Sequence, residues 1–142
     1  MRAAHLSPNR PEYYDRNPEL VGENWEDTNI APHAPAQRFT YTVPTGRKLL
    51  LSYAYGRIFR GVAPTTPAIA KLYIGVYQPG MGTKDVFWVE YYGSNVGDMV
   101  INDATLNLVI PSGWSIYGYS MDGSTDGKCA YRLHFAGVTF DA

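Results

Sequence analysis

The residues that could support catalysis or metal binding are few and far apart in this sequence. Its three histidines are His5, His33 and His134, and no two of them have the short spacing of a metal-binding pair. The single cysteine, Cys129, alternates with apolar residues near the C-terminus. We therefore interpret His134 as a wall residue of a strand, and Cys129 as a small buried hydrophobe rather than a nucleophile.

The sequence DGSTDG, at residues 122–127, has side-chain oxygens at Asp122, Ser124 and Asp126, as the start of a calcium-binding loop does. An EF-hand loop needs a glutamate at its twelfth position, and that position is Leu133 here. A hairpin turn and a structural metal site both stay open, and the missing glutamate favours the turn.

Acid–base catalysis needs paired carboxylates in a pocket. The acidic residues after residue 36 lie mostly in predicted turns, where solvation explains them. Glu90 is in the middle of a predicted strand, and we expect a Lys or Arg opposite it on a neighbouring strand. No nucleophile elbow, P-loop or dinucleotide-binding motif is present. The sequence therefore predicts a protein that is not an enzyme and uses no cofactor.

Composition excludes two further classes of partner. The 142 residues carry a formal net charge of −1, which argues against binding nucleic acid through phosphate neutralisation. No apolar run is long enough to span a membrane, and the N-terminus lacks the apolar stretch of a signal peptide. We expect a soluble protein made in a reducing cytosol, with neither nucleic acid nor membrane as a partner.

From residue 37 onward, apolar and polar residues alternate with a period of two. The alternating stretches are separated by clusters of Gly, Pro, Asn or Asp, namely PTTP (64–67), PGMG (79–82), GSNVGD (93–98) and DGSTDG (122–127). Many short strands with regular turn signals are typical of an antiparallel sandwich or barrel. Residues 37–142 are therefore predicted to form an all-β body.

Two predicted corners in this body share a Pro-x-Gly pattern. VPTG (residues 43–46) and IPSG (residues 110–113) each have a proline, which cannot donate to a ladder, two residues before a glycine, which permits a positive φ. We interpret them as the points where a strand crosses from one sheet to the other, as in a jelly-roll-like antiparallel β-sandwich. The alternative is two unrelated turns.

Residues 1–36 differ in composition from the rest. They hold five of the ten prolines, and three Arg against six Asp or Glu. Such a segment buries too little apolar surface to fold alone, so it is predicted to be an extended N-terminal arm. Its aromatic and apolar side chains either fold back on the protein's own body or anchor the arm on another subunit. The candidate anchors are Tyr13, Tyr14, Arg16, Leu20, Trp25 and Ile30.

The arm passage EYYDRNPELVGENWEDTNIAPHAP, the strand RFTYTVPTGRKLLL and the later segment IPSGWSIYGYSMDG resemble the capsid decoration (cement) proteins of tailed bacteriophages. The nearest likeness is to the trimeric type found in thermophilic phages. The resemblance implies a structural virion protein, made in the host cytoplasm, that binds the major capsid protein as a homotrimer. It would stabilise the capsid from its outer surface by cross-linking neighbouring subunits through the arm.

The alternative is a receptor- or carbohydrate-binding head domain of a phage tail or fibre protein. In that reading, exposed Trp88, Tyr91, Tyr92 and Trp114 would stack on sugar rings.

Overall fold

The computed structural model describes residues 16–30, 33–93 and 95–142. Within these ranges the chain forms eight β-strands and no helix. The described part of the chain therefore contains no helix that could cross a membrane. The strands are β1 (Glu19–Ile30), β2 (His33–Thr42), β3 (Arg47–Val62), β4 (Ala68–Gln78), β5 (Gly82–Gly93), β6 (Met99–Ile110), β7 (Ser115–Asp122) and β8 (Lys128–Asp141).

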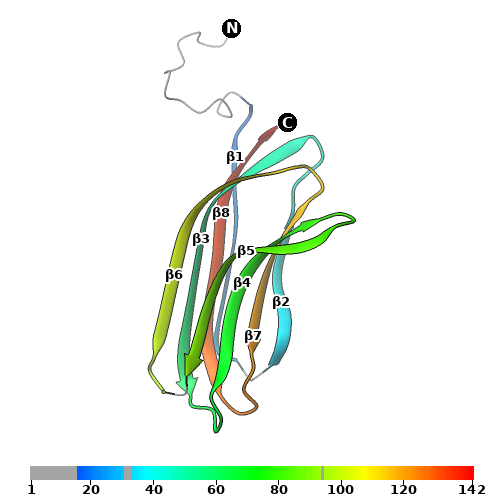
Figure 1. Ribbon diagram of the computed structural model, residues 1–142. Coiled ribbons are helices and arrows are strands. Elements are labelled where there is room, and N and C mark those ends of the chain that lie inside the picture. The colour runs from blue at the N-terminus through cyan, green and yellow to red at the C-terminus, as the bar shows by residue number, and fades with distance from the viewer. Residues whose placement is uncertain (1–15, 31–32, 94) are drawn as a thin grey trace.

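The strands form two four-stranded sheets that pack face to face (Figure 1). Sheet A has the order β1-β8-β3-β6 and sheet B the order β2-β7-β4-β5, and every pairing is antiparallel. Successive strands lie in opposite sheets except β4 and β5, which form a hairpin within sheet B. Eight antiparallel strands wound in this order make a jelly roll. The predicted all-β, jelly-roll-like sandwich is confirmed.

The core lies between the sheets and follows the period of the strands. In β8, alternate residues from Cys129 to Phe135 are buried, while the residues between them are half-buried on the outer face. Phe39 of β2 approaches Phe135 across the layer, with ring centroids 5.7 Å apart. A register slip of one residue would turn each of these side chains to solvent, so the buried set fixes the strand pairing.

Both predicted corners connect the two sheets. VPTG leads from β2 of sheet B to β3 of sheet A, and IPSG leads from β6 of sheet A to β7 of sheet B. Gly46 and Gly113 have φ values of 79° and 82°, which residues with a side chain adopt only with strain. The prediction of sheet-crossing corners is confirmed, in preference to two unrelated turns.

The N-terminal part of the chain differs from its prediction. The sequence predicts an arm over residues 1–36, whereas Glu19–Ile30 form edge strand β1 and the strand β2 already begins at His33. The alternation in β1 is hard to recognise because Glu23 takes an inward position, opposite the buried Phe135. Pro35 is tolerated because β2 is an edge strand with a register shift at that point. The sandwich therefore begins at Glu19.

Candidate binding surfaces

Trp25, one of the predicted anchors, packs against the protein's own body. Its ring stacks on Tyr131 of β8 at a centroid distance of 6.0 Å. The guanidinium of Arg38 lies 4.9 Å from the centre of the Trp25 ring, and its Nε donates to Ser120 Oγ over 2.8 Å. Of the two interpretations left open by the sequence, Trp25 follows the one in which the ring folds back on the body.

The other predicted anchors have different positions. Leu20 is 85% exposed on edge strand β1, and Arg16 is exposed just before that strand. The main chain of Ile30 pairs with Cys129 at the end of β1, but its side chain is outside the described residues. Tyr13 and Tyr14 also lie outside them. The structure thus brings no two of the described anchors into one site.

Arg47 binds the residues just before β1 to the end of β8. Its guanidinium donates to the carbonyl oxygen of Asn17 and to Asp141 Oδ1, each over 2.7 Å. Asn17 Nδ2 donates to the other carboxylate oxygen of Asp141 over 2.6 Å, and the Asp141 amide donates to the Arg16 carbonyl over 2.7 Å. Arg16 and Asn17 are therefore bound beside the end of the C-terminal strand β8.

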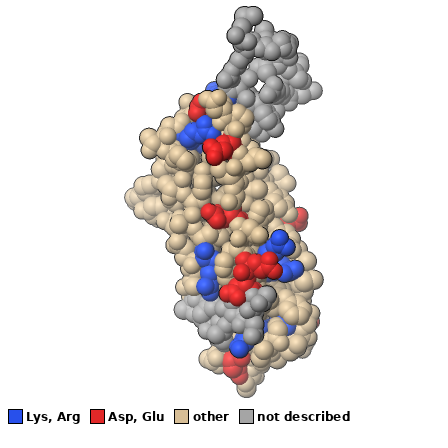
Figure 2. Space-filling model, turned by 180° about the vertical axis from the view of Figure 1, so that it is seen from behind, with Lys and Arg blue, Asp and Glu red and all other residues tan. Residues whose placement is uncertain are grey.

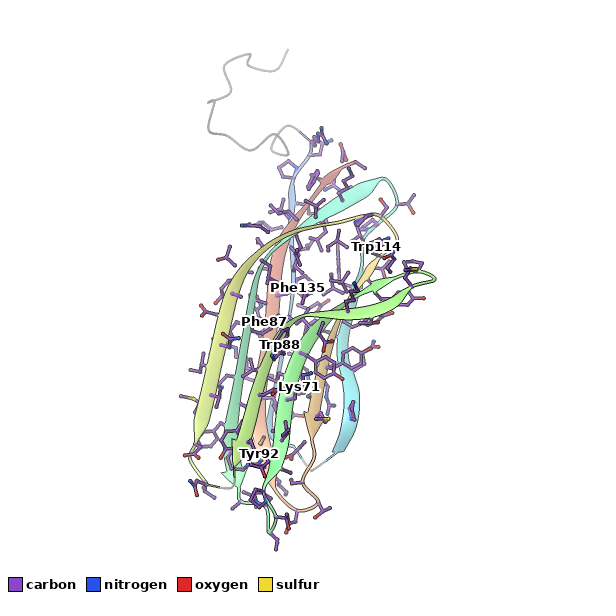
Figure 3. The ribbon with its side chains drawn as sticks, in the orientation of Figure 1. Lys71, Phe87, Trp88, Tyr92, Trp114 and Phe135 are labelled. Atoms are coloured by element: carbon purple, nitrogen blue, oxygen red, sulfur yellow. The ribbon has the colours of Figure 1, made fainter. Side chains whose placement is uncertain are left out.

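The outer side of sheet B carries a row of aromatic rings. Tyr73 and Tyr119 stack with centroids 4.9 Å apart and planes 11° apart. Trp88 of β5, labelled in Figure 3, is the register partner of Tyr73. Burial raises the pKa of both tyrosine hydroxyls, so they remain hydrogen-bond donors. We call this surface the aromatic face; its members are Tyr73, Tyr77, Trp88, Tyr92, Tyr117 and Tyr119.

The aromatic residues that the sequence suggests for sugar stacking do not form one site. Trp88 and Tyr92 are exposed, at 52% and 71%. Tyr91 is buried and its hydroxyl donates to Asp98 Oδ2 over 3.0 Å. Trp114 is half-buried and packs against the core at the IPSG corner. Glu90 lies opposite Lys71, as predicted, although the ion pair of Lys71 is with Asp85 at 3.4 Å.

The side of the sandwich between β5 and β6 is open. Both are edge strands, and the inward residues of β6 up to Leu108 are at most half-buried, whereas those of β8 are fully buried. A cleft of about 320 Å³ lies there; it is lined mainly by apolar side chains, among them Met81, Val86, Leu108, Val109 and Trp114. We call β5, β6 and this cleft the open edge.

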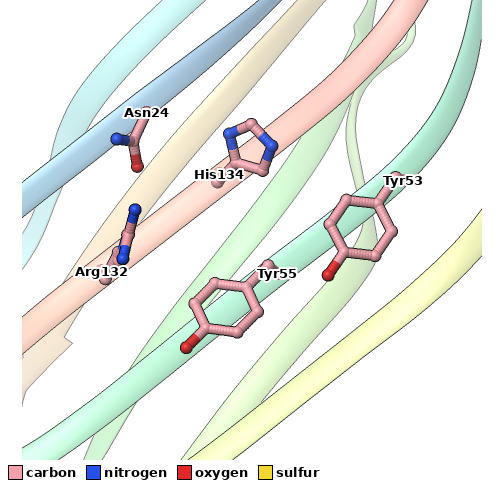
Figure 4. Close-up of a pocket in the computed structure, with 5 residues that line it drawn as sticks. All are labelled: Asn24, Tyr53, Tyr55, Arg132 and His134. Atoms are coloured by element: carbon pink, nitrogen blue, oxygen red, sulfur yellow. The ribbon is translucent and has the colours of Figure 1, made fainter.

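A second hollow lies on the outer face of sheet A (Figure 4). Three neighbouring strands supply its walls, and the volume is about 300 Å³. We call it the sheet A pocket; it is lined by Asn24 of β1, Tyr53 and Tyr55 of β3, and Arg132 and His134 of β8. The sequence gives no sign of this pocket, because its residues are individually ordinary and only strand pairing brings them together.

Charged side chains do not form a field of one sign on the face shown in Figure 2. Blue Lys and Arg side chains lie beside red Asp and Glu side chains there. A protein that tracks a phosphate backbone needs an extended basic surface, and this face does not offer one.

Cys129 and the DGSTDG loop, the candidates for catalysis and metal binding, have structural roles. Cys129 is fully buried, and burial raises the pKa of its thiol to about 11, so the prediction of a buried hydrophobe is confirmed. In the DGSTDG loop, the carboxylate of Asp126 accepts hydrogen bonds from Thr65, and Asp122 Oδ1 accepts one from the Ser124 amide over 3.0 Å. Within the described ranges, no group of three or more His, Cys, Asp or Glu could hold a metal ion.

A buried ion pair was not predicted. Arg60 of β3 and Asp122 of β7 join the two sheets, with Nη1 and Oδ2 3.2 Å apart, and both side chains are almost fully buried. Nothing in the sequence separates Arg60 from the other basic residues of the body, so only the fold reveals the pair.

The strand order defines the described part of the chain as an eight-stranded jelly-roll sandwich. No family model matches the sequence, and no curated protein sequence matches it. Among solved structures, a protein of the infectious bursal disease virus Gx strain is 12% identical with a TM-score of 0.47 over 99% of this chain and 37% of that one. The chain therefore spans little more than a third of that viral protein.

Two bacterial proteins are also similar in structure. One is from the disulfide-linked pili of Bacillus endospore appendages, 13% identical, with a TM-score of 0.34 over 87% of this chain and 86% of that one. The other is the Yersinia pseudotuberculosis-derived mitogen, 8% identical, with a TM-score of 0.33 over 84% and 86%. Likenesses this distant concern chain architecture alone, so the functional argument depends on the protein's own residues.

Proposed function

We propose that the protein is a structural virion protein that decorates the outer surface of a phage capsid and stabilises it. It acts as a homotrimer, its partner is the major capsid protein, and it catalyses no reaction. The sequence resemblance to capsid decoration proteins supports the choice of partner. The open edge of the sandwich is the observation that carries a role in protein contacts.

The open edge has the chemistry of a protein interface. Val109 and Met81, which line its cleft, are 57% and 77% exposed, and Met99 and Ile101 add further exposed apolar surface along β6. Soluble monomers rarely expose contiguous apolar patches of more than a few hundred Å². Contacts between identical subunits are richer in apolar side chains than other interfaces, so we assign this edge to the contact between copies of the chain.

Direct strand-to-strand pairing is disfavoured at this edge. Asn107 has a φ of 54° and interrupts the regular course of β6, and Lys84 and Glu90 place charges along β5. Bulges and charges of this kind protect an edge from adding another strand. In a cyclic trimer, side chains of this edge would contact an unlike surface of the next subunit, and such contacts form a ring when the rotation between subunits closes.

The contact with the capsid is assigned to the N-terminal residues that precede the sandwich. If extended, the 18 residues before Glu19 would reach about 60 Å. Because Trp25 is occupied within the body, the proposed capsid anchors become Tyr13, Tyr14, Arg16 and the exposed Leu20. The network around Arg47 gives this segment a fixed starting point.

The trimer can be tested by light scattering coupled to size-exclusion chromatography. We expect the wild type to have three times the mass of the chain, and the double variant Met81→Lys/Val109→Lys to be monomeric with an unchanged fold, since both side chains are exposed. Leu20→Lys, on the opposite edge, is the control and should stay trimeric. A wild-type monomer at micromolar concentration would contradict the proposal.

The capsid contact can be tested by cosedimentation with capsids that lack the protein. In the full chain, Tyr13→Ser/Tyr14→Ser should weaken binding by about tenfold or more, because aromatic anchors dominate the binding of extended segments. Tyr92→Ser removes an exposed ring from the aromatic face and should bind as the wild type does. If the paired variant also binds normally, the N-terminal segment is not the link to the capsid.

The aromatic face favours a second candidate, the receptor- or carbohydrate-binding head. Trp88, Tyr73 and Tyr119 form a continuous row on which a neutral sugar could stack. Titration with neutral oligosaccharides should then change tryptophan fluorescence, and Trp88→Ala should abolish binding. No binding at millimolar sugar would dismiss this candidate.

A further inference from the structure

We infer that the sheet A pocket binds a saccharide unit that carries a carboxylate, and that Arg132 holds the acid group. This site lies on the outer face of sheet A, whereas the proposed contacts use the open edge and the N-terminal segment. The inference goes beyond the proposed function and does not depend on it.

The charges around Arg132 indicate an anionic ligand. In the cross-strand row Glu26–Arg132–Arg57, the two arginines are direct register partners. Like charges opposite each other destabilise a sheet. The carboxylate of Glu26 lies 3.9 Å from Arg57, on the other side of β8. Among the described residues, the side chain of Arg132 has no ion pair, although it lines a pocket.

Asp103 does not supply the missing charge either. Asp103 is on β6, so β3 separates it from Arg132 on β8. Its carboxylate accepts a hydrogen bond from the Tyr53 hydroxyl over 3.4 Å. Burial, together with the charge of Asp103, raises the pKa of Tyr53, which keeps this hydroxyl protonated. Asp103 therefore binds the Tyr53 hydroxyl, and Arg132 remains available to a ligand.

The rest of the pocket has the features of a sugar site. Tyr53 and Tyr55 project from the same face of β3, about 7 Å apart along the strand (Figure 4). The centroid of the Tyr53 ring lies 6.1 Å from that of the His134 ring. Such rings pack against the C–H faces of pyranoses. The Asn24 amide and the His134 imidazole add donors and acceptors for hydroxyl groups.

The ligand is a sugar unit rather than a small inorganic anion. Phosphate or sulfate would use Arg132 but would leave the rings and the Asn24 amide without a role. The planar guanidinium can hold a carboxylate with two parallel hydrogen bonds. A volume of about 300 Å³ is at the lower end of the range for small-molecule sites, which fits one sugar unit of a longer chain.

Calorimetric titration of the full-length protein with a trigalacturonate tests this inference. We expect a Kd on the order of 1 mM, and at least tenfold weaker binding of the uncharged galactose trisaccharide. Arg132→Gln should weaken trigalacturonate binding by about tenfold, because it removes the charge that holds the carboxylate. Arg132→Lys keeps the charge but lacks the planar guanidinium. Its affinity for trigalacturonate should lie between those of the wild type and Arg132→Gln. Tyr55→Ala should weaken binding of the same probe by about fivefold.

Lys128→Gln is the matched control, since it removes a positive charge from the same face of β8 but outside the pocket. It should change the Kd for trigalacturonate less than twofold. If it weakens binding as much as Arg132→Gln does, positive charge anywhere on this face attracts the probe, and the proposed site is rejected. Inorganic phosphate and a triglutamate peptide serve as competing probes. If either binds as tightly as trigalacturonate, or if Arg132→Gln has no effect, the saccharide site is rejected. Capsid cosedimentation by the same variants should be unchanged, which separates this outcome from the proposed function.

Discussion

The amide of Val43 donates to the carbonyl oxygen of Trp114, and the amide of Gly113 donates to the carbonyl oxygen of Val43, each over 2.9 Å. The VPTG and IPSG corners therefore form one hydrogen-bonded unit, although they lie in distant parts of the sequence. The hydroxyl of Ser112 also donates to the carbonyl oxygen of Arg47. Because the two sheet-crossing corners satisfy each other's backbone groups, each fixes the position of the other.

The first prediction concerns these corners. Gly113→Ala should lower the free energy of unfolding by about 1–2 kcal/mol, because a side chain at its positive φ is strained. Urea denaturation measures the change. Gly61→Ala is the control, since an added Cβ there would meet only the carbonyl oxygen of Lys128, at an ordinary contact distance of 3.9 Å. Equal stability of Gly113→Ala and the wild type would show that the corner tolerates another backbone conformation.

The second prediction separates the two interpretations of Trp25. Trp25→Ala should lower the free energy of unfolding by about 2–3 kcal/mol, because the half-buried ring stacks on Tyr131 and lies under Arg38. Leu20→Ala, on the same strand but exposed, should change it by less than about 0.5 kcal/mol. A Trp25→Ala protein of normal stability that fails to bind capsids would restore Trp25 as a partner anchor.

The third prediction concerns the buried pair of Arg60 and Asp122. Either Arg60→Met or Asp122→Asn should lower the free energy of unfolding by about 3–5 kcal/mol, because each leaves an unpaired buried charge. The double variant should recover much of this loss, since no charge remains and the introduced asparagine keeps an oxygen for the Ser124 amide. A double-mutant cycle from urea denaturation measures the coupling; additive losses would contradict it.

The fourth prediction concerns Cys129 and alkaline pH. Burial raises the pKa of its thiol from 9.0 to about 11 in the folded protein. The unfolded chain releases this proton first, so the stabilising contribution is complete below pH 9.0 and is lost as the pH rises towards about 11. We expect the fall in stability over this range to be smaller in Cys129→Ala than in the wild type. The same slope in both proteins would contradict it.

Thiol labelling provides an independent check on Cys129. At neutral pH the folded protein should react with a thiol reagent only as fast as it unfolds, whereas the denatured chain should react at once. Rapid labelling of the folded protein would mean that the thiol is accessible.

Much of the fold could be predicted from local signals. The period-two alternation after residue 37 indicated the strands, and the Pro-x-Gly corners indicated where they change sheets. The position of Cys129 among alternating apolar residues indicated its burial. Each of these signals depends on a few neighbouring residues, which is why the sequence alone contains it.

Only the tertiary structure decided where β1 belongs, how Arg60 meets Asp122, and which side chains share the sheet A pocket. Residues 19–30 carry a weak alternation, and they are ordered as a strand because β8, from the other end of the chain, supplies their hydrogen-bond partners. The ion pair and the pocket likewise join strands that are distant in sequence. Such contacts depend on strand order and register, which local sequence patterns do not contain.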